Sequence, residues 1–182
     1  MHRRLPLLRA EPEVRQPQRD ARQGGRTHTA QTNGRVIDIR ELTEAEVPSV
    51  DERLPLSRLD VAQTYLVAWD GDDPVGHAHL AWSGTTLGIP EVQDVYVLPE
   101  RRRQGVATEL SRAAEQLVAA GGLKQISIGA SVRNDGALRL YRRLGYRDAE
   151  LPPQRVQGTI IIRGVPMDID DTLVYLVKEL SA

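Results

Sequence analysis

The stretch from Glu91 to Tyr146 constrains the fold of this chain most strongly. Its apolar segment at 92–98 predicts a β-strand, which leads through Pro99 and a basic turn around Gly105 into residues 106–118, where apolar side chains recur at helical spacing. This order places unpaired backbone N–H groups and the positive end of a helix dipole at the end of a strand. The stretch therefore predicts an anion-binding site.

A second strand and a second helix follow. Gly121 and Gly122 end the first helix, and residues 124–130 alternate as a strand does. A strand, a helix and a strand with short connections form a parallel crossover unit. Asn134 is expected to cap the next helix, which carries Tyr141 on its inner face and ends at Gly145.

The remaining segments complete a sheet. Strands are predicted at 36–39, 64–69 and 74–83, with a helix after Thr43 and Glu46, which form a capping-box pattern. Beyond Tyr146 we expect strands at 159–162 and 172–177, joined by an acidic turn at 168–171. The predicted fold class is α/β (α+β): a mixed, twisted sheet with helices on both faces.

Charge divides the chain into two parts. Residues 1–33 hold seven arginines against three acidic residues, with no apolar periodicity, so we expect 1–33 to be a disordered extension and 34–182 to be the folded domain. An arginine-rich arm that touches RNA or an acidic surface is the alternative. The remainder carries 17 basic and 22 acidic residues, so nucleic acid is not expected as a partner.

Composition excludes several kinds of chemistry. Cysteine is absent, so the chain has neither a disulfide framework nor a thiolate nucleophile. No apolar run approaches the ~18 residues that a membrane helix needs, and we expect a cytoplasmic protein. His77 and His79 would share one strand face, but no third ligand follows at a recognisable spacing, so no metal is expected.

Two motifs carry a family resemblance. Residues 102–107, Arg-Arg-Gln-Gly-Val-Ala, follow a strand that ends Val-Tyr-Val-Leu-Pro-Glu, and Asn134 precedes Ala-Leu-Arg-Leu-Tyr-Arg-Arg-Leu-Gly-Tyr at 137–146. From about Arg35 to its end, the chain resembles the GCN5-related N-acetyltransferase (GNAT) family. The resemblance implies the GNAT acyl-CoA N-acyltransferase fold, acetyl-CoA as co-substrate, and direct transfer of acetyl to a primary amine of a small molecule or protein in a ternary complex. The alternative is a non-catalytic domain that binds acyl-CoA and regulates a partner.

The resemblance also implies site residues. Backbone groups near Val95 and Val97, together with Asn134, would contact the pantetheine arm, and the N–H of Val97 would act as an oxyanion donor. Tyr141 would donate a proton to the departing thiolate, although a core position is its alternative role. The pyrophosphate would lie on one run of residues: Arg102, Arg103, Gln104, Gly105, Val106, Ala107 and Thr108.

The base and the acceptor are less defined. Glu91 is the first candidate for the base, and Asp94 and His79 stay open as alternatives. The acceptor amine is unidentified, because the fold does not choose among acceptors. The segments 43–60, 83–90 and 150–171 would form its site, and a monomer or homodimer is expected.

Overall fold

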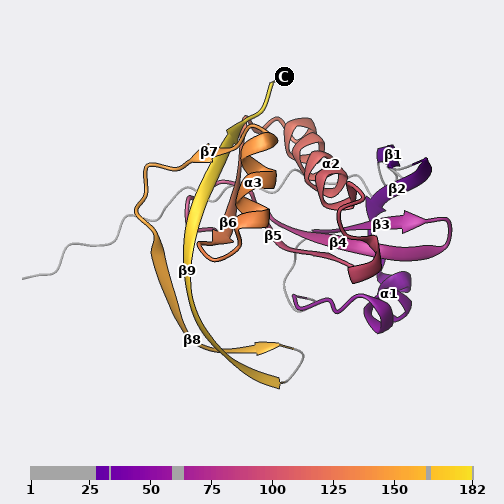
Figure 1. The fold of residues 1–182 in the computed structure, drawn as a ribbon, viewed down its shortest axis with the longest axis horizontal. Helices are drawn as coiled ribbons and strands as arrows, with labels where there is room; N and C mark the ends of the chain where they lie inside the picture. Colours follow the sequence, from indigo (N-terminus) through magenta and orange to yellow (C-terminus); the bar gives the residue numbers. More distant parts are fainter. Residues whose placement is uncertain (1–27, 33, 59–63, 163–164, 182) are drawn as a thin grey trace, which may run out of the picture.

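The structure is a computed structural model that describes residues 28–32, 34–58, 64–162 and 165–181 (Figure 1). In this part of the chain, the strands form a single nine-stranded sheet in the order β1-β2-β3-β4-β5-β6-β9-β7, with β8 paired to β9. The strands are β1 (His28–Thr32), β2 (Arg35–Glu41), β3 (Thr64–Asp70), β4 (Asp73–Ala81), β5 (Glu91–Val97), β6 (Gln125–Ser131), β7 (Arg147–Asp148), β8 (Gln154–Ile162) and β9 (Val165–Glu179). The helices are η1 (Glu44–Glu46), α1 (Val47–Arg53), η2 (Pro99–Arg101), α2 (Val106–Ala120) and α3 (Asp135–Arg143).

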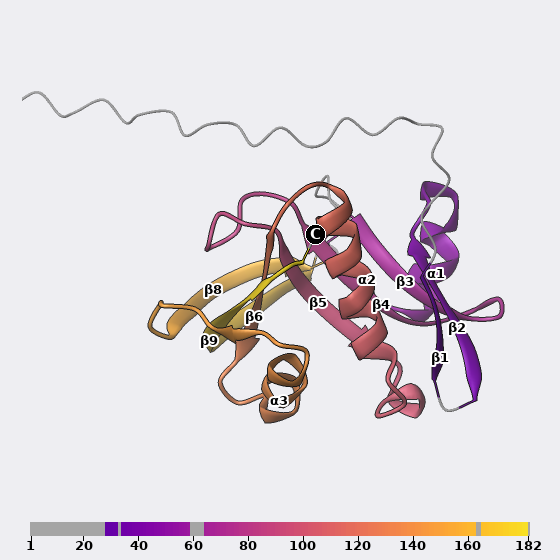
Figure 2. The same cartoon turned by 90° about the horizontal axis from the view of Figure 1, so that it is seen from above.

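Helices cover both faces of the sheet, as the sequence predicted (Figures 1 and 2). Strand β3 shows the division, because successive side chains of a strand point to opposite faces. Leu66 belongs to the main core beneath α2 and α3, whereas Val67 belongs to a second cluster that packs against Val50 of α1. The main core contains no phenylalanine and is built mostly from aliphatic side chains of the strands and α2.

Antiparallel pairing dominates the sheet, and the exception is β5 with β6. These two strands are parallel and are joined through α2, which confirms the predicted crossover unit. The predicted boundaries of this unit agree with the structure to within a few residues. Because α2 begins directly after Gly105, its first turn lies at the carboxyl end of β5.

The structure corrects the predicted extension at 1–33. Residues 28–32 form β1, which pairs with β2 from His28 opposite Ile39 to Thr32 opposite Arg35. The sequence His-Thr-Ala-Gln-Thr lacks apolar alternation, so its strand character depends on β2 and on contacts with α2. The predicted disorder of residues 1–27 and 33 falls outside the described residues.

The predicted turn at 168–171 is also wrong. These residues lie inside β9, which pairs with β8 from Gln154 opposite Leu173 to Ile162 opposite Val165. The two strands form a ribbon that projects from the body (Figure 1). The aspartates look like turn residues in the sequence, but they meet polar partners across the ribbon: Thr159 donates to Asp168 at 2.7 Å, and Arg155 forms an ion pair with Asp170 at 2.9 Å.

Within the described ranges, no helix is both long and apolar enough to cross a membrane.

Candidate active site

The two parallel strands at the centre of the sheet separate soon after they meet. β5 and β6 pair only at Glu91 with Ser127 and at Val92 with Ile128. Beyond this point a cleft of about 550 Å³ lies between β5, β6 and α3. The separation gives the structure an opening in the sheet directly beside the carboxyl end of β5.

A bulge in β5 accompanies the separation. The register between β4 and β5 shifts between His77, opposite Tyr96, and His79, opposite Gln93. Asp94 lies in this interval and has a positive φ of 50°, which is uncommon for a residue with a side chain. A bulge adds a residue to one strand and increases its local twist, so it turns the end of β5 away from a regular parallel pairing with β6.

The backbone of Val97 faces the cleft. The N–H of Leu98 donates to the carbonyl of Val75 at 3.0 Å, so Val97 and Gly76 form a non-hydrogen-bonded pair of the antiparallel ladder. The N–H and carbonyl of Val97 therefore point away from β4, toward the side where the cleft lies. Its carbonyl accepts a hydrogen bond from Nε of Arg102 at 3.0 Å. Among the described residues its N–H has no backbone partner, because β5 pairs with β6 only at Glu91 and Val92.

The turn before α2 has the backbone form of an anion site. Arg103 and Gly105 have positive φ values of 59° and 89°, and Gly105 stands at the N-cap without a side-chain cap. The N–H of Glu109 donates to the carbonyl of Gly105 at 3.1 Å, which makes it the first intrahelical donor. The N–H groups at 105–108 therefore have no partner within the helix, and among the described residues they remain available to bind an anion.

A second cleft, of about 640 Å³, lies over this turn. It shares Val97, Arg102 and Ala107 with the first, so the two form one continuous groove. Among the described residues, no carboxylate forms an ion pair with Arg102, Arg103 or Arg143. The lining of the second cleft is Val97, Arg101, Arg102, Arg103, Gly105, Val106, Ala107, Thr108, Gly136, Leu140 and Arg143.

Not all predicted residues of the turn present their side chains to the groove. Gln104 turns back and donates to the carbonyl of Glu100 at 2.8 Å, so only its backbone remains for a ligand. Arg101 lines the groove, yet its guanidinium forms an ion pair with Asp70 at 2.7 Å. Arg143, at the end of α3, was missed in the sequence, where it reads as a solvated residue of a helix C-terminus. Its charge faces the same groove.

Helix α3 supplies the other wall of the first cleft. The Asn134 side chain accepts a hydrogen bond from the N–H of Ala137 at 3.0 Å, so it caps α3 and also lines the cleft. Tyr141 lines the cleft and is 5% exposed. Burial raises the pKa of its phenol to about 12, so the hydroxyl keeps its proton at neutral pH. The structure thus places Val95, Val97, Asn134 and Tyr141 around one opening.

The candidate bases lie near one another on β4 and β5. Glu91 and His79 share the sheet face that carries Tyr65, and Asp94 lines the cleft while its charge also acts on Tyr65 and His79. Glu91 is 6% exposed, and one of its oxygens accepts from Gln93 Nε2 at 2.9 Å. Its other oxygen has no hydrogen-bond partner among the described residues, and burial raises the pKa of the carboxyl.

His77 and His79, which the sequence placed on one strand face, are both buried. Both have no exposed surface, and the Tyr65 ring contacts them at centroid distances of 5.4 Å for His77 and 5.0 Å for His79. Burial lowers the pKa of His79 to about 4, so its imidazole is neutral at pH 7. His77 Nε2 donates to the carbonyl of Pro55 at 3.1 Å. In the part of the chain that the structure describes, no cluster of three or more ligand-type side chains could hold a metal ion.

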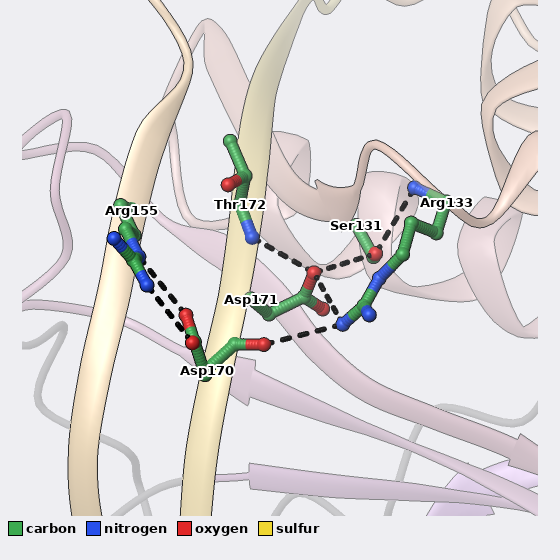
Figure 3. Close-up of polar contacts among 6 residues, drawn as sticks. All are labelled: Ser131, Arg133, Arg155, Asp170, Asp171 and Thr172. Atoms are coloured by element: carbon green, nitrogen blue, oxygen red, sulfur yellow. Dashed lines mark hydrogen bonds and ion pairs between the residues drawn. The ribbon is translucent and has the colours of Figure 1, made fainter.

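The β8–β9 ribbon is attached to the cleft wall by a polar network (Figure 3). Asp171 accepts hydrogen bonds from Ser131 at 2.9 Å and from Arg133 at 3.2 Å. Arg133 also donates to the carbonyl of Asp170 at 3.2 Å. Since Ser131 lines the cleft, the root of the ribbon is fixed beside the opening in the sheet.

The fold and site define an α/β protein whose sheet opens at two parallel strands beside an uncapped helix N-terminus. The family model described as "Acetyltransferase (GNAT) family" matches residues 36–146, and the chain belongs to this family. The region 36–146 contains every predicted site residue of the sequence.

Known relatives share this assignment. A mycothiol acetyltransferase from Clavibacter michiganensis is 33% identical over 105 residues, which are 58% of this chain and 33% of the relative. The chain thus spans about a third of the length of the curated relatives it matches. The GNAT domain of S. lividans PAT has a TM-score of 0.61 at 16% identity, and the match covers 85% of this chain and 97% of that domain. A GNAT family acetyltransferase from Elizabethkingia anophelis with acetyl-CoA bound has a TM-score of 0.54 at 17% identity, with 79% and 98% covered. These likenesses show a common fold.

Proposed function

We propose that the chain is an N-acetyltransferase that moves an acetyl group from acetyl-CoA to a primary amine, by direct attack in a ternary complex. The observation that carries the proposal is the continuity of the groove: the opening between β5 and β6 leads directly to the free N–H groups at the start of α2. Membership of the GNAT family supports the same activity.

The residues of the groove fit acetyl-CoA. Free backbone N–H groups at 105–108 and the guanidinium groups of Arg102, Arg103 and Arg143 suit a pyrophosphate, because both are complementary to its charge. Gly105 takes the positive φ of 89° that this turn requires, a conformation that glycine adopts without steric strain. The cleft beside Val95, Asn134 and Tyr141 suits the extended pantetheine arm.

Acetyl transfer replaces a carbon–sulfur bond by a carbon–nitrogen bond. The amine nitrogen bonds to the acetyl carbonyl carbon, and the carbon–sulfur bond breaks. The N–H of Val97 stabilises the negative charge that develops on the carbonyl oxygen. Tyr141 gives its proton to the departing thiolate, and Glu91 is our first candidate to take the proton that the amine loses. Burial raises the pKa of the Glu91 carboxyl above its ordinary value, which makes its carboxylate a stronger base.

The acceptor is proposed only as an amine. The aspartates of β9 form ion pairs or hydrogen bonds with Arg155, Arg133 and Thr159. Their charge is therefore partly compensated, and it does not single out a cationic acceptor. A cytoplasmic location, a monomeric or homodimeric state and the absence of a nucleic-acid partner stay predictions from the sequence.

A thiol-release assay with acetyl-CoA and a panel of primary amines tests this proposal. Release of one coenzyme A thiol for each acetylated amine is the expected result. The alternative, a non-catalytic acyl-CoA-binding domain, predicts heat of acetyl-CoA binding in calorimetry without amine-dependent thiol release. A folded sample that gives no heat with either coenzyme A or acetyl-CoA would overturn both.

A further inference from the structure

Strand β1, which precedes the region matched by the family model, lies against helix α2. Thr32, at the end of β1, is 9% exposed, and its Cγ2 lies 3.3 Å from the position that a Cβ on Gly105 would occupy. At the other end of β1, His28 contacts α2 through both ring nitrogens. The strand therefore holds the helix at its N-cap and along its first three turns.

His28 forms the polar part of this contact. Its Nε2 lies 2.9 Å from Oε2 of Glu109, and its Nδ1 lies 3.1 Å from Oε1 of Gln116. Glu109 accepts a second bond at its other oxygen from Arg112 at 2.8 Å. The His28 and Glu109 side chains are only 19% and 11% exposed, so solvent screens their interaction less than it would at an open surface.

Glu109, the partner of His28, lies one helical turn after Gly105, which lines the groove. Glu109 donates its N–H to the carbonyl of Gly105, the residue whose left-handed backbone begins α2. Thr32 packs against the same residue from the side away from the groove, and neither Thr32 nor His28 lines either cleft. A side chain at position 105 would meet Thr32, so the missing side chain of Gly105 also permits the approach of β1.

We propose that His28 and Thr32 are positioning residues for the phosphate-binding turn: β1 holds the first turn of α2 so that the N–H groups at 105–108 stay aimed at the pyrophosphate. This inference rests on the proposed function, since it assigns these N–H groups to acetyl-CoA. It places functional residues outside the matched region, in a segment that the sequence indicated to be disordered.

A comparison of two acetyl donors distinguishes positioning from general stabilisation. His28→Ala and Thr32→Ala are each assayed with acetyl-CoA and with S-acetylpantetheine, which lacks the pyrophosphate. We expect KM for acetyl-CoA to rise about threefold to tenfold. This is less than the full value of one charge-assisted hydrogen bond, because losing the contact displaces the phosphate-binding turn only in part. KM for S-acetylpantetheine and for the amine should stay at the wild-type values, because neither ligand uses the turn.

Helix α2 offers a matched control for the polar contact. Glu115 has the same side-chain exposure as Glu109, 11%, and forms an ion pair with Lys178 of β9 at 2.6 Å, further along the helix from the turn. Glu109→Gln should weaken acetyl-CoA binding in calorimetry as His28→Ala does, and Glu115→Gln should not. Thr32→Val preserves the shape of Thr32 and should bind like the wild type.

The outcomes separate the two proposals. Equal losses with both donors, or an unchanged KM for acetyl-CoA in both alanine variants, would overturn the positioning inference while the enzyme remains active. Equal losses in Glu109→Gln and Glu115→Gln would overturn it as well. If His28→Ala does not fold, the comparison of Thr32→Ala with Thr32→Val decides. A wild-type protein that binds no acetyl-CoA would instead refute the proposed function.

Discussion

The Cγ2 atom of Thr32 stands 3.3 Å from the site where a β-carbon on Gly105 would be built. Gly105 also has a φ of 89°, a conformation that residues with side chains rarely adopt. Two constraints therefore favour glycine here: the positive φ of the turn that frees the first N–H groups of α2, and the close approach of Thr32 from β1. The phosphate-binding turn is thus enclosed between the groove and the N-terminal strand.

Gly105→Val tests this enclosure. The substitution should abolish measurable acetyl-CoA binding in calorimetry, because the side chain displaces the turn. It should also lower the free energy of unfolding by about 1–3 kcal/mol, the usual cost of a left-handed backbone at a residue with a side chain. Gly122→Val is the control, since Gly122 follows the other end of α2 with a φ of 81° and no atom within 4 Å of its added Cβ. It should lose stability and keep binding. A Gly105→Val protein that binds acetyl-CoA as the wild type does would contradict the assignment of the turn.

The central part of the site could be predicted because its signals are local. Helix α2 has periodic apolar residues, and Gly105 and Asn134 mark the starts of helices by their own backbone and side-chain chemistry. The structure then places Val95, Val97, Ala107 and Tyr141 around one groove, as the order of elements implied. The roles assigned to these residues stay predictions.

Features that depend on distant partners were missed. The bulge at Asp94 follows from the register between β4 and β5, which no local pattern of β5 reveals. Strand β1 has a polar sequence, and His28 acquires its partners 81 and 88 residues away on α2. The aspartates at 168–171 have the composition of a turn, and only pairing with β8 makes them a strand.

Tyr141→Phe should lower kcat by about a hundredfold, the low end of the range expected for loss of a general acid. Binding of acetyl-CoA should be unchanged, because the ring keeps its place beside the Tyr146 ring, with centroids 5.9 Å apart. Burial raises the pKa of the wild-type phenol to about 12, so ionisation of Tyr141 should cause no loss of rate below about pH 11. Steady-state rates from pH 7 to 10 measure the fall in kcat and its independence of pH, and calorimetry measures acetyl-CoA binding.

Tyr146→Phe is the control for this change, since Tyr146 is buried but does not line the cleft. It should retain the wild-type kcat. Equal rates for Tyr141→Phe and wild type across the whole pH range would show that the thiolate leaves without help from this phenol.

His79 makes the fold sensitive to mild acid. Burial lowers its pKa from 6.5 to about 4, so the unfolded chain binds a proton first as the pH falls. The free energy of unfolding is therefore highest above about pH 6.5, where His79 is neutral in both the folded and the unfolded chain. It falls by about 3 kcal/mol in total as the pH drops from 6.5 to 4. Urea unfolding at a series of pH values measures this slope.

His79→Leu should reduce the slope between pH 6.5 and 4 without removing it, because burial also lowers the pKa of His77. Glu46 affects stability at a lower pH, because the hydrogen bond from Arg40 lowers its pKa from 4.5 to about 2. The stability that its ionised form supplies is lost between pH 4.5 and 2. An unchanged slope above pH 4.5 in His79→Leu would disprove the assignment to His79.

Glu91→Gln should separate activity from stability. The carboxyl is 6% exposed, and burial raises its pKa above the ordinary 4.5, so ionisation of Glu91 opposes folding as the pH rises through 4.5 and beyond. The glutamine variant should therefore be at least as stable as the wild type at pH 8 in urea unfolding, and this difference should vanish below about pH 4, where both forms are uncharged. Its kcat/KM for a primary amine should nevertheless fall about a hundredfold, because the amide cannot accept a proton.

Asp94→Asn is the paired measurement, since Asp94 lines the cleft directly. A large loss in Asp94→Asn with full activity in Glu91→Gln would move the base to the cleft side of β5.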